Sequence, residues 1–600
     1  MVSEVTPVSS HLTKIETKQG IEVRQLAASP SADQSREESV RPPPYRHFPL
    51  NTTGATQNTS PSLQPAPLGS PGEARWRFGE ILCAVVCLLT ALAVRWRAAD
   101  HSPSFDELWI LAGATGYGEN LLGIPPNRLE TEAICTTAVE QAKSPWVVWS
   151  RGVTFHPPLH MVTLWGWRAF WGGSDWVAAM YSAVCAVVGI GFVFAALRYQ
   201  AGVGPATCVS LCLALSPVQT QLGTEIRGYG LLLALVGCVL WQMVRIETFG
   251  PTRRRVWLLG LTLLPLMLTH YFAAATCLGV CVWGLLRLPV TLRWQLAGAV
   301  LVAALTYAVI WIPFTTTHLQ HAQTMVLYKA RVPFLQGAAR SALALPVKLL
   351  FVVSPARQRE WMVVGAMFGL LLVSGVWRSS RVTPWALLLV LPIGLLLVVD
   401  AARGTNQAAL VRYAAAASLA AAATPILSAF AIRNWLGWTV GIGCVLLTLV
   451  GLGGPRQMGS PSFGHMRQAL FPILQAESPQ IPLVVQETQE YLGFFDRAML
   501  LEWLHTPGFL PRPVMFVGNP PEDVEQAVAA ATPKGQFWLC LRSGPQPRTE
   551  LPESVRQAFP TARPVRPPIY VPAGQGGIQP EPAVELWLAA VGRERGAGEQ

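Results

Sequence analysis

The stretch EILCAVVCLLTALAVRW, residues 80–96, decides the fold of this chain. Its length falls in the range of roughly 17–25 apolar residues that a helix needs to cross the ~30 Å hydrocarbon layer of a membrane. The 600-residue chain shares this character, with 51% hydrophobic and 13% charged residues. We therefore expect an integral membrane protein rather than a set of soluble domains.

Further apolar runs of similar length follow the first one. They lie at 176–197, 203–220, 228–245, 256–270, 272–288, 294–313, 361–377, 383–399, 408–432 and 435–452. The sequence thus predicts an all-α polytopic bundle of about eleven transmembrane helices. With eleven crossings, the basic clusters that flank the apolar runs all fall on the cytoplasmic side, as the positive-inside rule expects. This count requires that 157–171 and 340–354 do not cross.

The remaining segments define the domain organisation. Residues 1–77 contain no apolar run and are predicted to be a disordered cytoplasmic tail, because Arg75 and Arg77 precede the first crossing. Residues 78–453 form the transmembrane domain, with outer loops at 97–175 and 314–360. Residues 454–600 alternate short apolar runs with helical stretches, which predicts a small extracytoplasmic α/β domain with a flexible C-terminus.

The net charge of +11 could suggest a nucleic-acid partner. Much of the basic excess lies in short clusters beside apolar runs, such as Arg253–Arg255, where charges orient membrane proteins. The sequence contains no phosphate-binding glycine loop and no HExxH zinc motif. We therefore expect a multi-pass protein of the plasma or inner membrane without a nucleic-acid partner.

Ionisable residues gather at the predicted outer ends of the helices, where charge is costly unless it faces water or a partner. They are Asp106, Glu107, His156, Glu225, Arg227, His270, Asp400, Arg403 and Arg412. A guanidinium group suits phosphate binding, and a carboxylate can accept a hydroxyl proton or bind a metal ion. Together they fit an anionic donor and an alcohol acceptor.

Each of these residues also has a purely structural interpretation. Asp106 has the residue type of a helix N-cap. Glu225 and Arg227 could pair at a helix start, and His270 could be a core histidine. Arg412 could extend its charged group to the membrane surface.

The spacing of His156 and His160 is that of a possible metal site. Histidines four residues apart can share a zinc ion, but Pro157 and Pro158 lie between them and instead predict a helix start. The carboxylates Asp106 and Glu107 leave a divalent metal open. The sequence favours no metal and no other cofactor.

The order of these residues resembles glycosyltransferase family 39, within the GT-C membrane glycosyltransferases. The resemblance covers about 78–450. It rests on the acidic pair 106–107, HPPL at 156–159, Glu-x-Arg-x-Tyr at 225–229, Thr-His-Tyr-Phe at 269–272 and Arg-Tyr at 412–413. Protein O-mannosyltransferases and lipid A aminoarabinose transferases belong to this family.

The resemblance implies inverting transfer of a sugar from a polyprenyl-phosphate carrier to a protein, lipid or glycan acceptor on the extracytoplasmic face. It implies Asp106 and Glu107 as the catalytic residues, with Asp106 as the base, and arginines that hold the lipid phosphate. The substrate-binding residues that it implies are His156, Glu225, Arg227, Tyr229, His270, Tyr271, Arg412 and Tyr413. Two alternatives stay open: a lipid or sugar transporter or flippase without covalent chemistry, and a non-catalytic assembly protein that works through its C-terminal domain.

Overall fold

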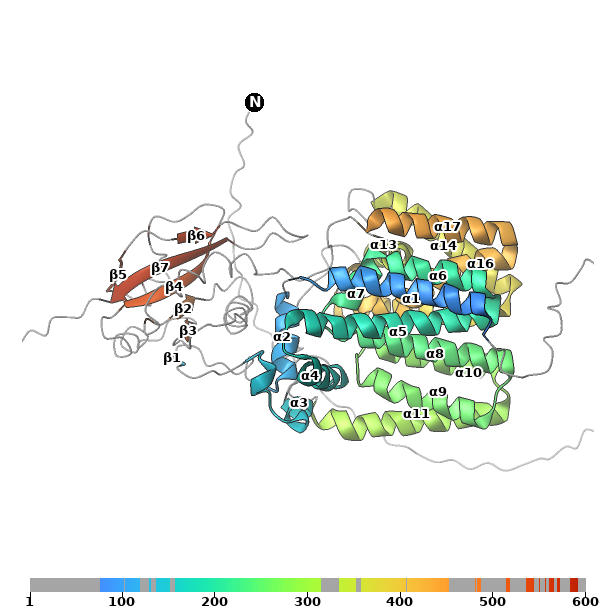
Figure 1. Ribbon diagram of the computed structural model, residues 1–600, viewed down its shortest axis with the longest axis horizontal. Helices are drawn as coiled ribbons and strands as arrows, with labels where there is room; N and C mark the ends of the chain where they lie inside the picture. Colours follow the sequence, from blue (N-terminus) through green and yellow to red (C-terminus); the bar gives the residue numbers. More distant parts are fainter. Residues whose placement is uncertain are drawn as a thin grey trace, which may run out of the picture. The chain divides into compact units, whose positions relative to one another are not determined.

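The computed structural model describes residues 76–101, 103–118, 129–130, 136–151, 157–314, 334–351, 358–405 and 407–452, with short segments between 481 and 591. The predicted tail lies outside these residues except for its last two. Within them the chain forms a helical bundle and, nearer its C-terminus, a set of strands (Figure 1).

Eight helices among the described residues are long and apolar enough to cross a membrane, so the protein is a multi-pass membrane protein. They are α1 (Phe78–Ala98), α5 (Asp175–Ala201), α8 (Tyr229–Phe249), α11 (Val290–Trp311), α14 (Gln358–Arg378), α15 (Thr383–Arg403), α16 (Ser418–Ile432) with the 3₁₀ segment η7 (Val411–Ala417) before it, and α17 (Asn434–Gly451).

All eleven predicted crossings are helical, but they are not equivalent. The predicted crossing 203–220 is a pair of helices, α6 (Val203–Leu215) and α7 (Pro217–Thr224), bent by 64° and counted as a ninth crossing if taken together. Helices α9 (Arg253–Met267) and α10 (Ala273–Arg287) have 15 residues each. At 1.5 Å per residue each is about 22 Å long, shorter than the hydrocarbon layer.

The short helices lie in the two predicted outer loops. The first loop contains α2 (Phe105–Ala114), the 3₁₀ turn η2 (Val139–Gln141), α3 (Pro145–Arg151) and α4 (Leu159–Trp171). The second begins at the end of η3 (Ile312–Phe314) and contains α13 (Phe334–Lys348). The 13 residues of α4 span about 20 Å, which is shorter than the hydrocarbon layer. The 3₁₀ turns η5 (Ser380–Val382) and η6 (Gln407–Ala409) flank α15.

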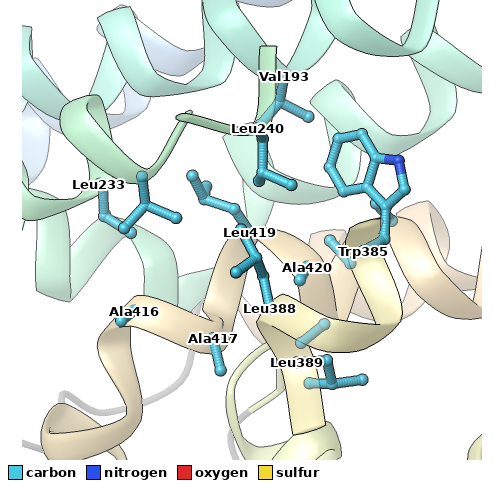
Figure 2. Close-up of a cluster of buried hydrophobic side chains, with 14 of the residues drawn as sticks. Val193, Leu233, Leu240, Trp385, Leu388, Leu389, Ala416, Ala417, Leu419 and Ala420 are labelled. Atoms are coloured by element: carbon cyan, nitrogen blue, oxygen red, sulfur yellow. The ribbon is translucent and has the colours of Figure 1, made fainter. Parts of the chain in front are cut away.

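The core of the bundle forms where helices distant in sequence meet. Val193 of α5, Leu240 of α8 and Trp385 of α15 gather with Leu419 of α16, as Figure 2 shows. Small residues bring α5 and α8 together: a Cβ atom on Gly237 would lie 2.7 Å from the carbonyl oxygen of Gly189. Small residues are the usual means by which helices approach closely in membranes.

The bend between α6 and α7 is held by Arg95, which is 1% exposed. Its guanidinium group donates to the carbonyl oxygens of Leu213, Ala214 and Gln219 at 3.2–3.3 Å. A helix break leaves carbonyl groups without their usual partners, and burying them unpaired costs free energy. Arg95 supplies donors at the break. The side chain of Ser216, which caps α7, donates to Leu350 at 2.6 Å.

Replacing Arg95 with Met is therefore expected to lower the free energy of unfolding by on the order of 1–3 kcal/mol, because the carbonyl groups at the bend lose their donor. The measurement is the melting temperature of the purified protein in detergent. Arg97→Met is the matched control, since Arg97 lies on the same helix but is exposed. An equal melting temperature for Arg95→Met and the wild type would contradict this role.

Basic side chains link the helix ends on the side of the bundle away from Asp106. Arg198 at the end of α5 pairs with Glu80 near the start of α1 at 2.7 Å. Arg381 donates to the carbonyl oxygen of Gln200, and Arg287 donates to that of Ser380. Arg198, Arg287 and Arg381 belong to the basic clusters that the sequence predicts to be cytoplasmic.

The described strands form one mixed sheet in the order β1-β3-β2-β4-β7-β5, with β6 also paired to β7. The strands are β1 (Leu129–Glu130), β2 (Leu483–Gln486), β3 (Val514–Val517), β4 (Gln536–Ser543), β5 (Ala562–Pro564), β6 (Ile569–Val571) and β7 (Ala583–Val591). β2 is parallel to β3 and β4, while β7 is antiparallel to β4. The edge strand β1 belongs to the first outer loop, and it pairs antiparallel with β3.

Candidate active site

Asp106 lies in the first turn of α2, beside arginines from two other parts of the chain. Its Oδ2 atom is 2.9 Å from Nη1 of Arg227 and 3.1 Å from Nη1 of Arg412. The side chain of Asp106 is 27% exposed, and the two arginine side chains are 11% and 12% exposed. One carboxylate is thus shared by two partly desolvated guanidinium groups.

The local structure excludes two of the structural interpretations. The N-cap of α2 is Ser104, so Asp106 does not cap this helix. Arg412 pairs with Asp106, and its side chain is largely buried and does not extend into solvent. Arg227 also pairs with Asp106, whereas Oε1 of Glu225 accepts a hydrogen bond from Gln221 at 3.3 Å.

Glu107 fixes the geometry of this centre. It is 2% exposed, and its two oxygens accept hydrogen bonds from the backbone N–H groups of Ser104 at 2.7 Å and Ile226 at 2.8 Å. His101 also contacts it at 3.0 Å. Burial raises the pKa of Glu107, but His101 and the two N–H groups outweigh burial and lower the pKa below its usual value. These contacts favour a positioning role over the catalytic role predicted from sequence.

Arg227 is presented by the short loop between α7 and α8. The bond from Ile226 to Glu107 joins this loop to the start of α2, across 119 residues of sequence. Glu225 in the same loop is buried, which raises its pKa to about 7, against the opposing effect of Arg227. Glu225 is therefore protonated in part near neutral pH, next to the two arginines.

Arg412 is presented by η7, and Asp400 supports the turn that precedes it. The carboxylate of Asp400 accepts hydrogen bonds from the Thr405 hydroxyl at 2.6 Å and from the N–H groups of Gln407 and Ala408 at 2.7 and 2.8 Å. A carboxylate that accepts several backbone N–H groups stabilises a tight turn. The contacts of Asp400 are therefore structural.

A series of aromatic rings connects the two arginines. Arg227 lies over the ring of Tyr229 at 5.1 Å, and Arg412 lies over that of Tyr413 at 5.4 Å. His270 lies between Tyr229 and Phe272, tilted against the first ring and stacked on the second, with ring centroids 5.6 and 5.5 Å away. Phe272 in turn contacts Tyr413 at 5.4 Å. Cation–π contacts of this kind hold guanidinium groups in place.

Not every predicted site residue joins this centre. Tyr271 is 41% exposed, unlike its buried neighbour His270. His156 lies outside the described residues, so the pairing of His156 with His160 stays untested. Among the residues that the structure describes, no group of three or more His, Cys, Asp or Glu side chains could hold a metal ion.

His160 is the residue at this centre that sequence reasoning did not select. It is 3% exposed and lines a small cavity with Arg227, Tyr229 and His270. The signal was present, since a histidine in the first turn of an apolar helix calls for a polar partner. Its spacing of four residues from His156 is instead typical of a metal site.

Comparison with known proteins gives only distant similarities. No family model matches the chain, and no curated protein matches its sequence. Among solved structures, ArnT from Cupriavidus metallidurans in the apo state is 13% identical, covers 85% of this chain and 98% of its own, and has a TM-score of 0.40. The same protein bound to undecaprenyl phosphate is 14% identical, with 84% and 97% covered and a TM-score of 0.39. An oligosaccharyltransferase from Archaeoglobus fulgidus is 12% identical, with 77% and 68% covered and a TM-score of 0.42. At TM-scores below 0.5 these similarities assign neither family nor activity.

Proposed function

We propose that the protein is a membrane glycosyltransferase, which transfers a sugar from a polyprenyl-phosphate donor to an acceptor hydroxyl on the extracytoplasmic face. The observation that carries this proposal is the contact of one carboxylate, Asp106, with two guanidinium groups, Arg227 and Arg412. Two cations in direct contact with one anion leave attraction for a further anion. Burial strengthens that attraction, because the effective dielectric constant is low.

A phosphate group at this position would compete with Asp106 for the arginines. Arg227 and Arg412 turn to the phosphate oxygens, which releases the carboxylate of Asp106 to accept a proton. The acceptor hydroxyl gives its proton to Asp106 while its oxygen bonds to the anomeric carbon. The bond from that carbon to the phosphate oxygen breaks, and the electron pair leaves with polyprenyl phosphate. Attack opposite the leaving group inverts the anomeric configuration.

The arginines and the base act on different parts of this reaction. Negative charge grows on the leaving phosphate, and cations already oriented toward it lower the barrier, an effect often worth roughly 3–4 kcal/mol for a single donor. Proton transfer to a placed carboxylate contributes on the order of 10²–10⁴-fold. Because the donor lipid is confined to the bilayer, a site at the end of the helices meets the sugar–phosphate bond at headgroup depth.

Two features support the proposed orientation. The basic cluster of Arg198, Arg287 and Arg381 lies at the helix ends away from Asp106, which by the positive-inside rule supports an extracytoplasmic position for Asp106. Strand β1 of the loop that follows Asp106 pairs with β3 of the C-terminal segment, which supports the same side for the domain 454–600.

The direct test uses purified protein, a polyprenyl-phosphate sugar with a radiolabelled sugar, and membrane extract as the source of acceptor. Release of polyprenyl phosphate together with labelled product is expected. The bend between α6 and α7 is a feature that transporters also use. Movement of the labelled lipid across reconstituted vesicles without any covalent change would therefore favour a transporter and overturn the proposal.

Glu225 gives a prediction about pH. Its carboxyl group, with a pKa of about 7, becomes anionic as the pH rises from 6 to 8, and the new charge opposes a phosphate at Arg227. Glu225→Gln is expected to match the wild type in affinity for polyprenyl phosphate at pH 6. At pH 8 the variant should bind about tenfold more tightly than the wild type, as one pKa unit of interaction implies.

The measurement is binding of polyprenyl phosphate to both proteins at each pH. The lipid phosphate has its own second ionisation at about pH 6, which changes binding to both proteins equally. The ratio of the two affinities at each pH is therefore independent of that ionisation. A ratio that stays constant from pH 6 to pH 8 would show that Glu225 does not control the charge of the site.

A further inference from the structure

Beside Arg227 lies a small cavity that the proposed reaction does not use. Its volume is about 10 Å³, and its walls include His160, Arg227, Gly228, Tyr229, Thr269 and His270. A space of this size holds about one water molecule or one hydroxyl group. We refer to it as the His160 pocket.

The His160 pocket contains polar atoms that are buried without a hydrogen-bond partner among the described residues. They are both ring nitrogens of His160 and the hydroxyl of Tyr229. These two residues are 3% and 1% exposed. A buried polar group without a partner costs free energy, and a ligand that supplies the partner recovers it.

The chemistry of these atoms selects the kind of ligand group. Burial and the nearby charge of Arg227 lower the pKa of His160 to about 3, so its ring is neutral at physiological pH. A neutral imidazole offers one N–H donor and one nitrogen acceptor, and the hydroxyl of Tyr229 both donates and accepts. A cationic group is disfavoured next to Arg227, and a carboxylate cannot donate to the imidazole nitrogen. The matching group is a neutral hydroxyl.

We propose that the His160 pocket binds one ring hydroxyl of the donor sugar, with His160 and Tyr229 as its hydrogen-bond partners. Arg227 lines this pocket and also pairs with Asp106, so it places the bound hydroxyl beside the phosphate site. The inference rests on the proposed function, and it makes this pocket the point at which the sugar, rather than the lipid phosphate, is recognised.

The test compares binding of sugar-free polyprenyl phosphate with binding of polyprenyl-phosphate esters of glucose, galactose, mannose and arabinose. His160→Ala and Tyr229→Phe are each expected to weaken binding of the preferred ester about tenfold, the effect of one lost hydrogen bond. Binding of the sugar-free lipid should change less than about twofold. Tyr199→Phe is the matched control. The ring of Tyr199 packs against Phe249, at the end of α8 opposite to Tyr229.

A second variant fills the pocket without removing a polar atom. A Cβ atom on Gly228 would lie 3.3 Å from the carbonyl oxygen of Thr269 and 3.6 Å from Cβ of His160. Gly228→Ala should therefore weaken binding of the sugar ester and spare the sugar-free lipid. Equal melting temperatures for the variants and the wild type verify that each one folds.

Deoxy analogues of the preferred ester identify the hydroxyl. The analogue that binds the wild type about tenfold more weakly should bind His160→Ala with no further loss, as a double-mutant cycle requires for one shared interaction.

Three outcomes would overturn the inference. If the variants weaken both lipids equally, the residues shape the phosphate site instead. If the variants change neither lipid, or no deoxy analogue couples to His160, the pocket holds only water. These results would leave the proposed function intact. If the wild type binds neither lipid, the proposed function fails as well.

Discussion

Replacing Asp106 with Asn is expected to lower the rate of sugar transfer by on the order of 10²–10⁴-fold, the usual contribution of a placed base. The amide has nearly the shape of the carboxylate, but it accepts no proton from the acceptor hydroxyl. Affinity for polyprenyl phosphate should be kept or increased, because Arg227 and Arg412 lose the anion that they share in this structure. A loss of turnover with intact binding separates a catalytic role from a structural one.

The measurement is release of polyprenyl phosphate in a single turnover, with lipid binding measured on the same preparation. Asp100→Asn is the matched control, since Asp100 lies in the same loop and is exposed. Wild-type turnover in Asp106→Asn would remove Asp106 from the mechanism. Loss of binding together with turnover would assign it to organising the arginines.

Replacing Arg227 with Met is expected to reduce both lipid binding and turnover, the latter by on the order of 10²–10³-fold, as for the loss of one oriented donor at a developing charge. Arg227→Lys should keep more activity than Arg227→Met but less than the wild type, because Lys lacks the planar fork that binds two phosphate oxygens. Arg412→Met should act in the same direction. Arg245→Met, at the other end of α8, is the control.

Arg227→Met also leaves Asp106 with one cation fewer, which destabilises the fold. Adding Asp106→Asn should therefore recover part of the lost melting temperature without recovering turnover. A double variant that regains activity would contradict the assignment of these residues to opposite ends of the reaction. Normal lipid binding in Arg227→Met would exclude Arg227 from the phosphate site.

The sequence was a good guide to the helices because an apolar run long enough to cross a membrane has few other interpretations. It also indicated the strands β2, β3, β4 and β7 through their short alternating runs. The bend after Leu215 was missed, although Ser216 and Pro217 are typical of a helix start. Hydropathy averages over such a bend, so 203–220 reads as one crossing.

The convergence of Asp106 with Arg227 and Arg412 followed from the expected alternation of helix ends. The contacts that position these three residues could not be predicted from the sequence. The bond from Ile226 to Glu107 depends on a backbone N–H, which any residue type supplies, so no sequence signal marks it. Arg95 lies near the end of the first apolar run, and nothing in the sequence marks it as buried at the bend. Its role depends on carbonyl groups that only a three-dimensional break exposes.

The bond between Glu107 and Ile226 constrains how the site opens for a large lipid. If α2 slides against the loop before α8 by about 1 Å, a buried carboxylate loses its partner, and such hydrogen bonds weaken steeply with distance. The start of α2 and the loop that carries Arg227 are therefore expected to move together. Arg412 belongs to a separate segment that Asp400 holds, so we expect this segment to shift relative to the other two when the carrier lipid enters.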